Sequence, residues 1–359
     1  MTGPRELPRG GLVRGRLPRG CALCEKGAKM VLLVTGRCGA GCYYCPLSAE
    51  KAGIDVIFAD ELRVRRPSDI LLEARLIDAL GTGITGGDPL CVPRRTVRYI
   101  RMLKRRFGRG HHIHLYTAGR FKPSLLEELA KAGLDELRFH PGPETWNSLE
   151  STPVAGLIKD AKRLGISTGA EVPAIPKKER ELLRLAASLD ALEADFLNLN
   201  ELEYSETNLE NLNSKGFRVR DDISAGALGS ESAARRVVED AKVSMTVHYC
   251  SSGYKDGIQL RRRLLRRAKN VAMPYQVITK DGTLLTGIIE ASPAMALLIM
   301  GHLRREKVPV RLFSHNRAEK RVEVAPWVIG EVRGLDRHRR FIIEEYPTAD
   351  GLEVERSLV

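Results

Sequence analysis

Three closely spaced cysteines in a glycine-rich segment are the clearest candidates for chemistry in this sequence. Cys38, Cys42 and Cys45 are separated by Gly-Ala-Gly and by Tyr-Tyr. Glycine lets the backbone wrap closely around a bulky group, and closely spaced thiolates are the usual ligands of iron–sulfur clusters. Because three thiolates leave the fourth iron of a cubane open, we expect a [4Fe–4S] cluster with one accessible iron. A zinc knuckle is the alternative, although zinc loops favour paired two-residue spacings.

A second candidate is a glycine-rich turn that follows the predicted strand 82–86. The turn consists of Gly86, Gly87, Asp88 and Pro89. Taken alone, Gly-Gly-Asp-Pro is an ordinary turn sequence. Its place directly after a strand makes it a candidate for ligand binding, because the chemistry of parallel barrels lies where their strands end.

The elements that would position these residues alternate between short apolar runs and longer amphipathic stretches, which is typical of a parallel sheet with crossover helices. We expect strands at 30–35, 82–86, 111–117, 135–140, 166–172 and 195–200, and helices at 68–80, 123–132 and 177–192. The predicted fold is α/β. It comprises an N-terminal basic arm with a Cys-x2-Cys pair (1–29), a partial (β/α)6 TIM-like barrel (30–269) and a small C-terminal α/β domain (270–359).

Two further segments have a distinctive pattern. Residues 205–222 are polar and lack apolar periodicity, which predicts a long functional loop or lid. In the C-terminal domain, strand-like runs flank the turns at Asp281-Gly282 and Asp350-Gly351, and a helix is expected over 293–305.

Polar side chains alternate with apolar ones along the later strands. Glu136, Arg138 and His140 share one face of a strand, and Asn198 and Asn200 share one face of another. If the apolar faces meet the helices, these polar groups line the barrel interior, where burial is costly unless something is bound. Tyr116, Thr117 and Glu171 lie at other strand ends, and we expect His111, His112 and His114 to be ordinary strand residues.

The Cys-x3-Cys-x2-Cys spacing, with the aromatic Tyr44 before the last cysteine, resembles the signature of the radical S-adenosylmethionine (SAM) superfamily. As a whole, residues 21–267 resemble an archaeal-type radical SAM protein related to the pyruvate formate-lyase activating enzymes. The resemblance implies an oxidoreductase whose open iron binds the amino and carboxylate groups of SAM. It also implies cleavage of SAM to methionine and a 5′-deoxyadenosyl radical, and an electron donor such as ferredoxin.

The resemblance also assigns binding roles to individual residues. Tyr44 would lie near the adenine, and Gly86, Gly87 and Asp88 would bind the methionine amino group. Asp88 stands where the family has Glu, which shortens the reach and keeps the charge. Polar residues at later strand ends would contact the ribose and carboxylate of SAM, and the expected ones are Thr117, His140, Glu171 and Asn198.

Four cysteines remain after the cluster is assigned. Cys21 and Cys24 have the spacing of a metal knuckle, and Cys250 follows a late predicted strand. These three residues predict a second metal site, either a structural zinc or an auxiliary [4Fe–4S] cluster. Cys91 is expected to be a small buried filler.

The net charge of +13 favours a polyanionic partner. Basic residues gather in the arm, over 94–109 and over 261–269, and such patches suit phosphate contacts. RNA, in particular tRNA, is therefore the expected substrate. The alternatives are a protein or peptide, as the family resemblance suggests, a small metabolite, and a non-catalytic iron–sulfur scaffold that binds RNA.

Composition also bears on location. The first twenty residues lack the apolar core of an export signal, and no apolar run approaches the length of a membrane span. We expect a cytoplasmic protein whose cysteines stay reduced. The abundance of Arg and Glu beside only two glutamines suggests a thermophilic source.

Overall fold

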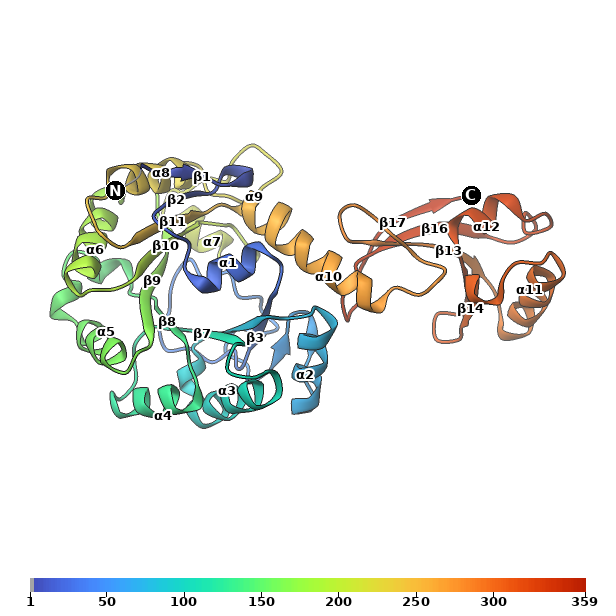
Figure 1. The fold of residues 1–359 in the computed structure, drawn as a ribbon. Coiled ribbons are helices and arrows are strands. Elements are labelled where there is room, and N and C mark those ends of the chain that lie inside the picture. The colour runs from blue at the N-terminus through green and yellow to red at the C-terminus, as the bar shows by residue number, and fades with distance from the viewer. Residues whose placement is uncertain (1–2) are drawn as a thin grey trace. The chain divides into compact units, whose positions relative to one another are not determined.

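The computed structural model describes residues 3–359, which form two units (Figure 1). The barrel unit consists of the chain up to residue 75 together with 79–260, and the C-terminal unit consists of 76–78 and 261–359. The expected boundary at 269 therefore moves to 260. The reason is that helix α10 (Arg261–Val271) is tied within the C-terminal unit, where Arg266 Nε donates to the carbonyl of Ile77 at 2.8 Å.

Seven parallel strands form the body of the barrel unit. In spatial order they are β11 (Thr246–Cys250), β10 (Phe196–Glu201), β9 (Ser167–Ala174), β8 (Glu136–Phe139), β7 (His112–Thr117), β6 (Gly81–Thr85) and β3 (Lys29–Leu33). The expected partial α/β barrel is confirmed; six of these strands match the six listed from the sequence, and β11 matches the late strand expected just before Cys250. Consecutive parallel strands place their carboxyl ends along one rim, which is where the sequence motifs lie.

Short antiparallel strands extend the sheet at both edges. Beside β11 lie β2 (Leu12–Arg14) and β1 (Arg5–Glu6), and beside β3 lie β4 (Phe58–Ala59) and β5 (Leu62–Arg63). The N-terminal segment expected as an arm is thus part of the sheet. The strand order runs from β1 to β5, so the described strands form an open barrel.

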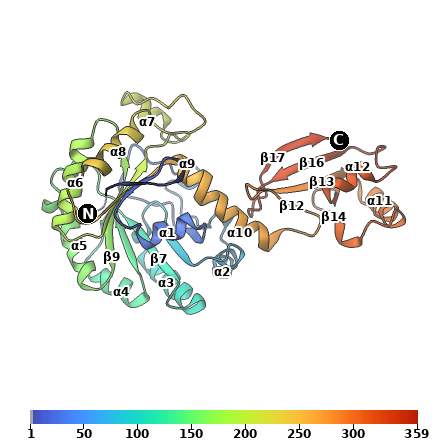
Figure 2. The same ribbon diagram turned by 45° about the horizontal axis from the view of Figure 1, so that its top comes forward.

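Amphipathic helices surround this sheet, and one short helix lies inside the ring (Figures 1 and 2). The surrounding helices bury apolar faces such as Val97, Ile100 and Leu103 of α3. Inside the ring, α1 (Arg19–Glu25) brings Gly20 so close to the side chains of Arg138 and His114 that a Cβ would clash with both. The other α-helices are α2 (Pro67–Leu76), α3 (Pro93–Phe107), α4 (Ser124–Ala132), α5 (Pro153–Arg163), α6 (Glu179–Ala191), α7 (Leu209–Ser214), α8 (Ser230–Asp240) and α9 (Ser252–Tyr254).

Short 3-10 and π-helical turns connect these elements. The 3-10 turns are η1 (Pro8–Gly10), η2 (Pro89–Cys91), η3 (Pro143–Thr145), η4 (Leu149–Ser151) and η6 (Val310–Leu312), and η5 (Lys255–Leu260) is a π-helical turn. Among residues 3–359 no helix is long and apolar enough to cross a membrane.

Beyond α10, the C-terminal unit consists of an antiparallel sheet and two more helices. Its elements are β12 (Val277–Ile278), β13 (Leu284–Glu290), α11 (Pro293–Arg305), β14 (Phe313–Asn316), β15 (Arg321–Val324), α12 (Pro326–Glu331), β16 (Arg340–Glu345) and β17 (Glu353–Leu358). The strand order is β14-β15-β13-β16-β17, and β12 pairs with β13 across the expected Asp281-Gly282 turn. Its core includes Ile289, Ile299 and Ile329.

Candidate active site

The loop that carries the three cysteines is held against the end of β6. This segment, residues 34–57 between β3 and β4, is called the cluster loop below. Gly87 N–H donates to the Thr35 carbonyl and Asp88 N–H to the Arg37 carbonyl, both at 2.8 Å. A Cβ on Gly87 would lie only 2.3 Å from the Arg37 carbonyl oxygen, so no other residue fits there. The Gly-Gly turn thus fixes where the cluster loop begins.

All three cysteines of the cluster loop line one cavity of about 550 Å³ at the rim of the barrel. Burial raises the pKa of the Cys42 thiol, the nearby Tyr44 hydroxyl lowers it, and negative charge on Cys38 and Cys45 raises it further. Three thiolates on one cavity wall can each bind a different iron of a cubane. This donor set fits a [4Fe–4S] cluster.

No group of three or more His, Cys, Asp or Glu side chains converges on a single metal ion within residues 3–359. This observation is compatible with a cubane, since each thiolate of a cubane binds a different iron atom.

Tyr44 connects the cluster loop to the strand ends. Its side chain is 6% exposed, and its hydroxyl lies 3.0 Å from His140 Nε2. His140 Nδ1 lies 2.7 Å from the Glu171 carbonyl, which can only accept a hydrogen bond. Nδ1 therefore carries the proton, and Nε2 of the neutral ring accepts from Tyr44. Burial lowers the pKa of His140, in agreement with a neutral ring.

The Asp88 carboxylate is buried and hydrogen-bonded within the barrel. Its side chain is 7% exposed, and one oxygen accepts from Leu90 N–H at 2.8 Å. The other oxygen accepts from the Thr117 hydroxyl at 3.1 Å and from Ala118 N–H at 2.9 Å. Gly86, Gly87 and Thr117 line the cavity, whereas Asp88 does not. The Asp88 carboxylate joins the ends of β6 and β7, and its expected role in binding SAM stays a prediction.

Below the cavity lies a buried polar network, as the alternation along the strands predicts. Arg138 is 2% exposed and pairs with the carboxylates of Glu136 and Glu171. Burial alone would raise the pKa of Glu171, but Arg138 and the amides of Asn200 and Asn198 lower it overall. Glu171 and His140 line the cavity, as expected.

The expected contact of Asn198 with SAM also stays a prediction. Asn198 is buried and lines neither of the two cavities at this rim. Its amide nitrogen donates to Glu171 Oε2 at 3.1 Å and to Cys21 Sγ at 3.3 Å. The neighbouring position on the same face, Asn200, is the one that reaches the cavity. The alternation identified the correct face but not the depth of each residue.

The wall of the cavity that follows β10 and β11 contains charged residues that the sequence interpretation missed. They are Glu201, Glu203 and Lys255. Glu203 and Lys255 form an ion pair at 3.1 Å between Oε1 and Nζ, with side chains 29% and 28% exposed. The only signal for them in the sequence was their place shortly after two predicted strands.

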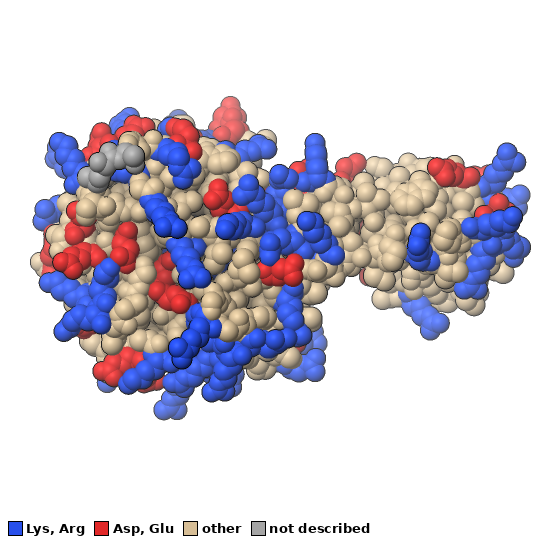
Figure 3. All heavy atoms as spheres, in the orientation of Figure 1, with Lys and Arg blue, Asp and Glu red and all other residues tan. Residues whose placement is uncertain are grey.

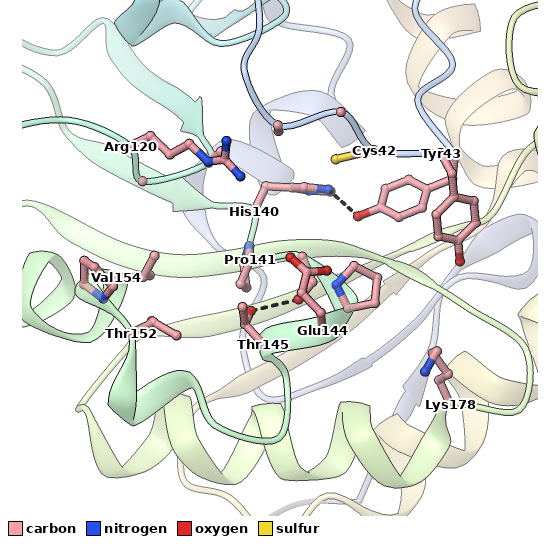
Figure 4. Close-up of a pocket in the computed structure, with 18 residues that line it drawn as sticks. Cys42, Tyr43, Arg120, His140, Pro141, Glu144, Thr145, Thr152, Val154 and Lys178 are labelled. Carbon is pink, nitrogen blue, oxygen red and sulfur yellow. Dashed lines mark hydrogen bonds between the residues drawn. The ribbon is translucent and has the colours of Figure 1, made fainter.

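A second cavity of about 600 Å³ adjoins the first and shares Cys42, Tyr44 and His140 with it (Figure 4). Its outer wall contains charged side chains of both signs, Arg120, Glu144 and Lys178. Tyr44 therefore lies at the border between the two cavities.

The polar segment after β10 covers the cluster loop, as the lid prediction implies. In this lid segment (residues 202–229), the amide nitrogen of Asn208 donates to the carbonyls of Tyr44 at 3.1 Å and Glu203 at 3.0 Å. The ring of Phe217 stacks on Tyr43, with ring centroids 6.5 Å apart.

The remaining cysteines have other surroundings. Cys21 Sγ accepts from Arg138 and Asn198, whereas Cys250 Sγ accepts from Gln259 at 3.4 Å. Burial raises the pKa of Cys21 strongly and that of Cys250 to about 12. The second metal at Cys21, Cys24 and Cys250 stays a prediction. Cys91, expected to be buried, is exposed.

Comparison with known proteins decides the family. A model of the radical SAM superfamily matches residues 32–189. A protein of Methanocaldococcus jannaschii, provisionally named a glycyl-radical enzyme activating enzyme, is 39% identical over 352 residues, covering 95% of this chain and 92% of that protein. The chain belongs to the radical SAM superfamily. The expected [4Fe–4S] cluster, SAM and relation to glycyl-radical activating enzymes are thereby confirmed. Residues 282–357 match a domain of unknown function.

Solved radical SAM structures are more distant relatives. The methyltransferase TsrM of Kitasatospora setae is 14% identical over 72% of this chain, with a TM-score of 0.38. SuiB of Streptococcus suis, bound to SAM, is 13% identical over 63% of this chain, with a TM-score of 0.42. The chain covers 54% and 50% of these two proteins, about half of each.

Proposed function

We propose that this radical SAM enzyme abstracts a hydrogen atom from the backbone glycine of a partner protein and so installs a glycyl radical. The observation that carries the proposal is the 39% identity, over nearly the whole chain, to a protein provisionally named a glycyl-radical enzyme activating enzyme. We further propose a cytoplasmic location.

When bound, the cluster and SAM would supply an electron and a 5′-deoxyadenosyl radical, with the electron coming from an external one-electron donor. The abstraction breaks one Cα–H bond of glycine and forms one C5′–H bond of 5′-deoxyadenosine. The residues of this chain would bind and orient the reactants and exclude water. Cys38, Cys42 and Cys45 would hold the cluster, while Gly86, Gly87, Thr117 and the Tyr44–His140 pair would surround SAM.

RNA, the substrate expected from the charge, is the second candidate, and one observation favours it. Helix α3 carries Arg94, Arg98, Arg101, Arg105 and Arg106 and no acidic residue, and lysine and arginine gather where α3 lies (Figure 3). The lining of the cavity disfavours RNA, because the carboxylates of Glu171 and Glu203 would repel the phosphate groups of a nucleotide bound there. The protein substrate is therefore preferred.

The two candidates can be separated with deuterium. Reconstituted, reduced enzyme and SAM would be incubated with protein and RNA fractions from cells grown on glycine deuterated at Cα, and 5′-deoxyadenosine would be analysed by mass spectrometry. We expect deuterium in 5′-deoxyadenosine only with the protein fraction, and none with the Cys42→Ala variant. If only RNA stimulates formation of 5′-deoxyadenosine, the protein substrate is excluded and RNA takes its place.

A further inference from the structure

Glu203, Lys255 and Asn200 line the cavity, and each has a polar atom or N–H bond for which residues 3–359 supply no hydrogen-bond partner. Asn200 lies near the end of β10, Glu203 follows that strand, and Lys255 begins η5 after β11; all three line the cavity of the cluster cysteines. Free polar atoms on the wall of a catalytic cavity are the groups that a substrate can engage. The three residues are called the polar wall below.

Glu203 offers one acceptor atom in a fixed position. Its Oε1 accepts from the Ser252 hydroxyl at 2.6 Å and from Lys255 Nζ at 3.1 Å. Its Oε2 accepts no hydrogen bond from any residue within 3–359. The backbone is fixed as well, because the Glu203 carbonyl accepts from Asn208 and Glu203 forms a β-bridge with Gly226. One carboxylate oxygen is thus held and the other remains available.

Lys255 offers the complementary donor. An ammonium group has three N–H bonds, and only the one toward Glu203 is used among the described residues. Burial would lower the pKa of Lys255, but the Glu203 carboxylate outweighs it and the pKa is raised. The ammonium group therefore stays charged at neutral pH and can donate to a further acceptor in the cavity.

Asn200 offers a second acceptor. Its Nδ2 donates to Glu171 Oε1 at 2.8 Å. The carboxylate of Glu171 only accepts, so the amide nitrogen must face it and Oδ1 must point elsewhere. Within residues 3–359 no donor reaches Oδ1. The polar wall thus combines two acceptors and one cationic donor.

We propose that the polar wall binds the main chain of a peptide substrate, with Lys255 donating to a backbone carbonyl and Glu203 and Asn200 accepting from backbone N–H groups. This inference rests on the proposed action on a protein glycine. A peptide bond presents one acceptor and one donor close together, which matches the polar wall. Main-chain recognition also suits a glycine, which has no side chain for the enzyme to select.

Equilibrium binding tests the inference without turnover. The probe is a short fluorescein-labelled peptide with blocked ends and one central glycine, titrated by anisotropy against the reconstituted enzyme with SAM and no reductant. Because each charge-assisted hydrogen bond contributes roughly a factor of ten in affinity, we expect Lys255→Met and Glu203→Leu each to raise the dissociation constant about tenfold. Lys255→Arg, which keeps the charge and the donors, should restore part of the affinity.

Matched control variants and a second measurement distinguish weaker peptide binding from misfolding of a variant. Glu206→Gln and Lys242→Gln change the same residue types at exposed positions and should bind like the wild type. The double variant Glu203→Leu, Lys255→Met removes both charges together and so leaves no unpaired buried charge. Under turnover, the KM for a peptide deuterated at glycine is measured from the rate at which deuterated 5′-deoxyadenosine forms. This KM does not depend on the fraction of enzyme that carries an assembled cluster.

The outcomes separate this inference from the proposed function. A wild type that binds the peptide and labels 5′-deoxyadenosine, with unchanged dissociation constant and KM in the polar-wall variants, overturns the inference alone. Free glycine binding as tightly as the blocked peptide would overturn it too, because the polar wall would then recognise an amino acid. A wild type that labels 5′-deoxyadenosine from no peptide, while an RNA oligonucleotide stimulates SAM cleavage, overturns the proposed function.

Discussion

Tyr44 and His140 join the cluster loop to the barrel rim, with the tyrosine hydroxyl 3.0 Å from the imidazole Nε2. The other ring nitrogen donates to the Glu171 carbonyl, so a single neutral histidine connects the cluster loop to β8 and β9. This pair fixes the aromatic residue of the cysteine motif at the border between the two cavities. It explains why an aromatic with a hydroxyl group suits this position in this chain.

The Tyr44–His140 contact should contribute measurably to stability. Tyr44→Phe leaves Nε2 of a buried imidazole without its donor, which should cost about 1–3 kcal/mol in the free energy of unfolding. In a protein that already carries His140→Leu, the Tyr44→Phe substitution should be nearly neutral for stability. A double-mutant cycle from denaturant unfolding measures the coupling, expected to be about 1–3 kcal/mol. Additive effects of the two changes would show that the hydrogen bond does not form.

Each of the three loop cysteines should be required for the cluster. Replacing Cys38, Cys42 or Cys45 with Ala removes one thiolate ligand, so the paramagnetic signal that SAM perturbs in the reduced protein should disappear. Cys91→Ala is the matched control, since Cys91 is also exposed but lies outside the cluster loop. Iron and sulfide analysis accompanies the spectra. A wild-type signal in any of the three variants would show that the ligand set is different.

Gly87 should tolerate no side chain. In Gly87→Ala the new Cβ would lie 2.3 Å from the Arg37 carbonyl, so the start of the cluster loop must move away from β6. We expect a loss of several-fold in SAM affinity, measured by equilibrium dialysis, together with reduced iron content. Gly156→Ala, where a Cβ meets no atom within 4 Å, should instead stabilise helix α5 by up to about 1 kcal/mol. Equal SAM affinity in the two variants would contradict this role of Gly87.

The sequence predicted the strands and the cysteine loop well because these features are local. The apolar runs, the glycines and the cysteine spacing are set within a few residues of one another. By contrast, the pairing of β2 with β11 joins residues more than two hundred positions apart, and nothing in the short segment Leu12–Arg14 indicates its partner. Long-range pairing of short strands is the part of this fold that local patterns cannot supply.

The site was predicted less completely, for a different physical reason. Asp88 has the right charge and position along the chain, yet both oxygens of its carboxylate already accept hydrogen bonds, from Leu90, Thr117 and Ala118. Whether a carboxylate is free depends on hydrogen bonds from other strands, which a motif does not encode. The same holds for Lys255, whose approach to Glu203 depends on how β10 and β11 end side by side.

Buried neutral His111 should make the protein less stable in mild acid. Burial, with Lys29 and Lys104 nearby, lowers the pKa of His111 from 6.5 to about 4. As the pH falls below 6.5, the unfolded chain takes up a proton and the folded chain does not, so stability falls until the pH reaches about 4. The loss is at most about 3 kcal/mol. His111→Gln should flatten this dependence in urea unfolding between about pH 7 and about pH 5; an unchanged slope would contradict the assignment.

Asn208 should control how well the lid segment protects the cluster loop. It is 1% exposed, and its amide donates to the carbonyls of Tyr44 and Glu203 while its oxygen accepts from Ser205 N–H at 2.8 Å. Asn208→Leu removes all three hydrogen bonds and leaves buried polar groups unsatisfied, at a cost of about 1–3 kcal/mol each at most. The lid segment should then open more often, and the cluster should bleach several-fold faster in air.

Two further variants show whether the Asn208 amide itself is responsible. Asn208→Asp keeps the acceptor for Ser205 but cannot donate, and it places a negative charge against two carbonyl oxygens, so it should bleach at least as fast as Asn208→Leu. Asn211→Ala, at an exposed position on α7, should bleach like the wild type. The rate is followed by the loss of visible absorbance after exposure to oxygen. If Asn208→Asp retained wild-type oxygen tolerance, the donor contacts to Tyr44 and Glu203 would not be what closes the lid segment, because the substitution removes those contacts while preserving the size of the side chain.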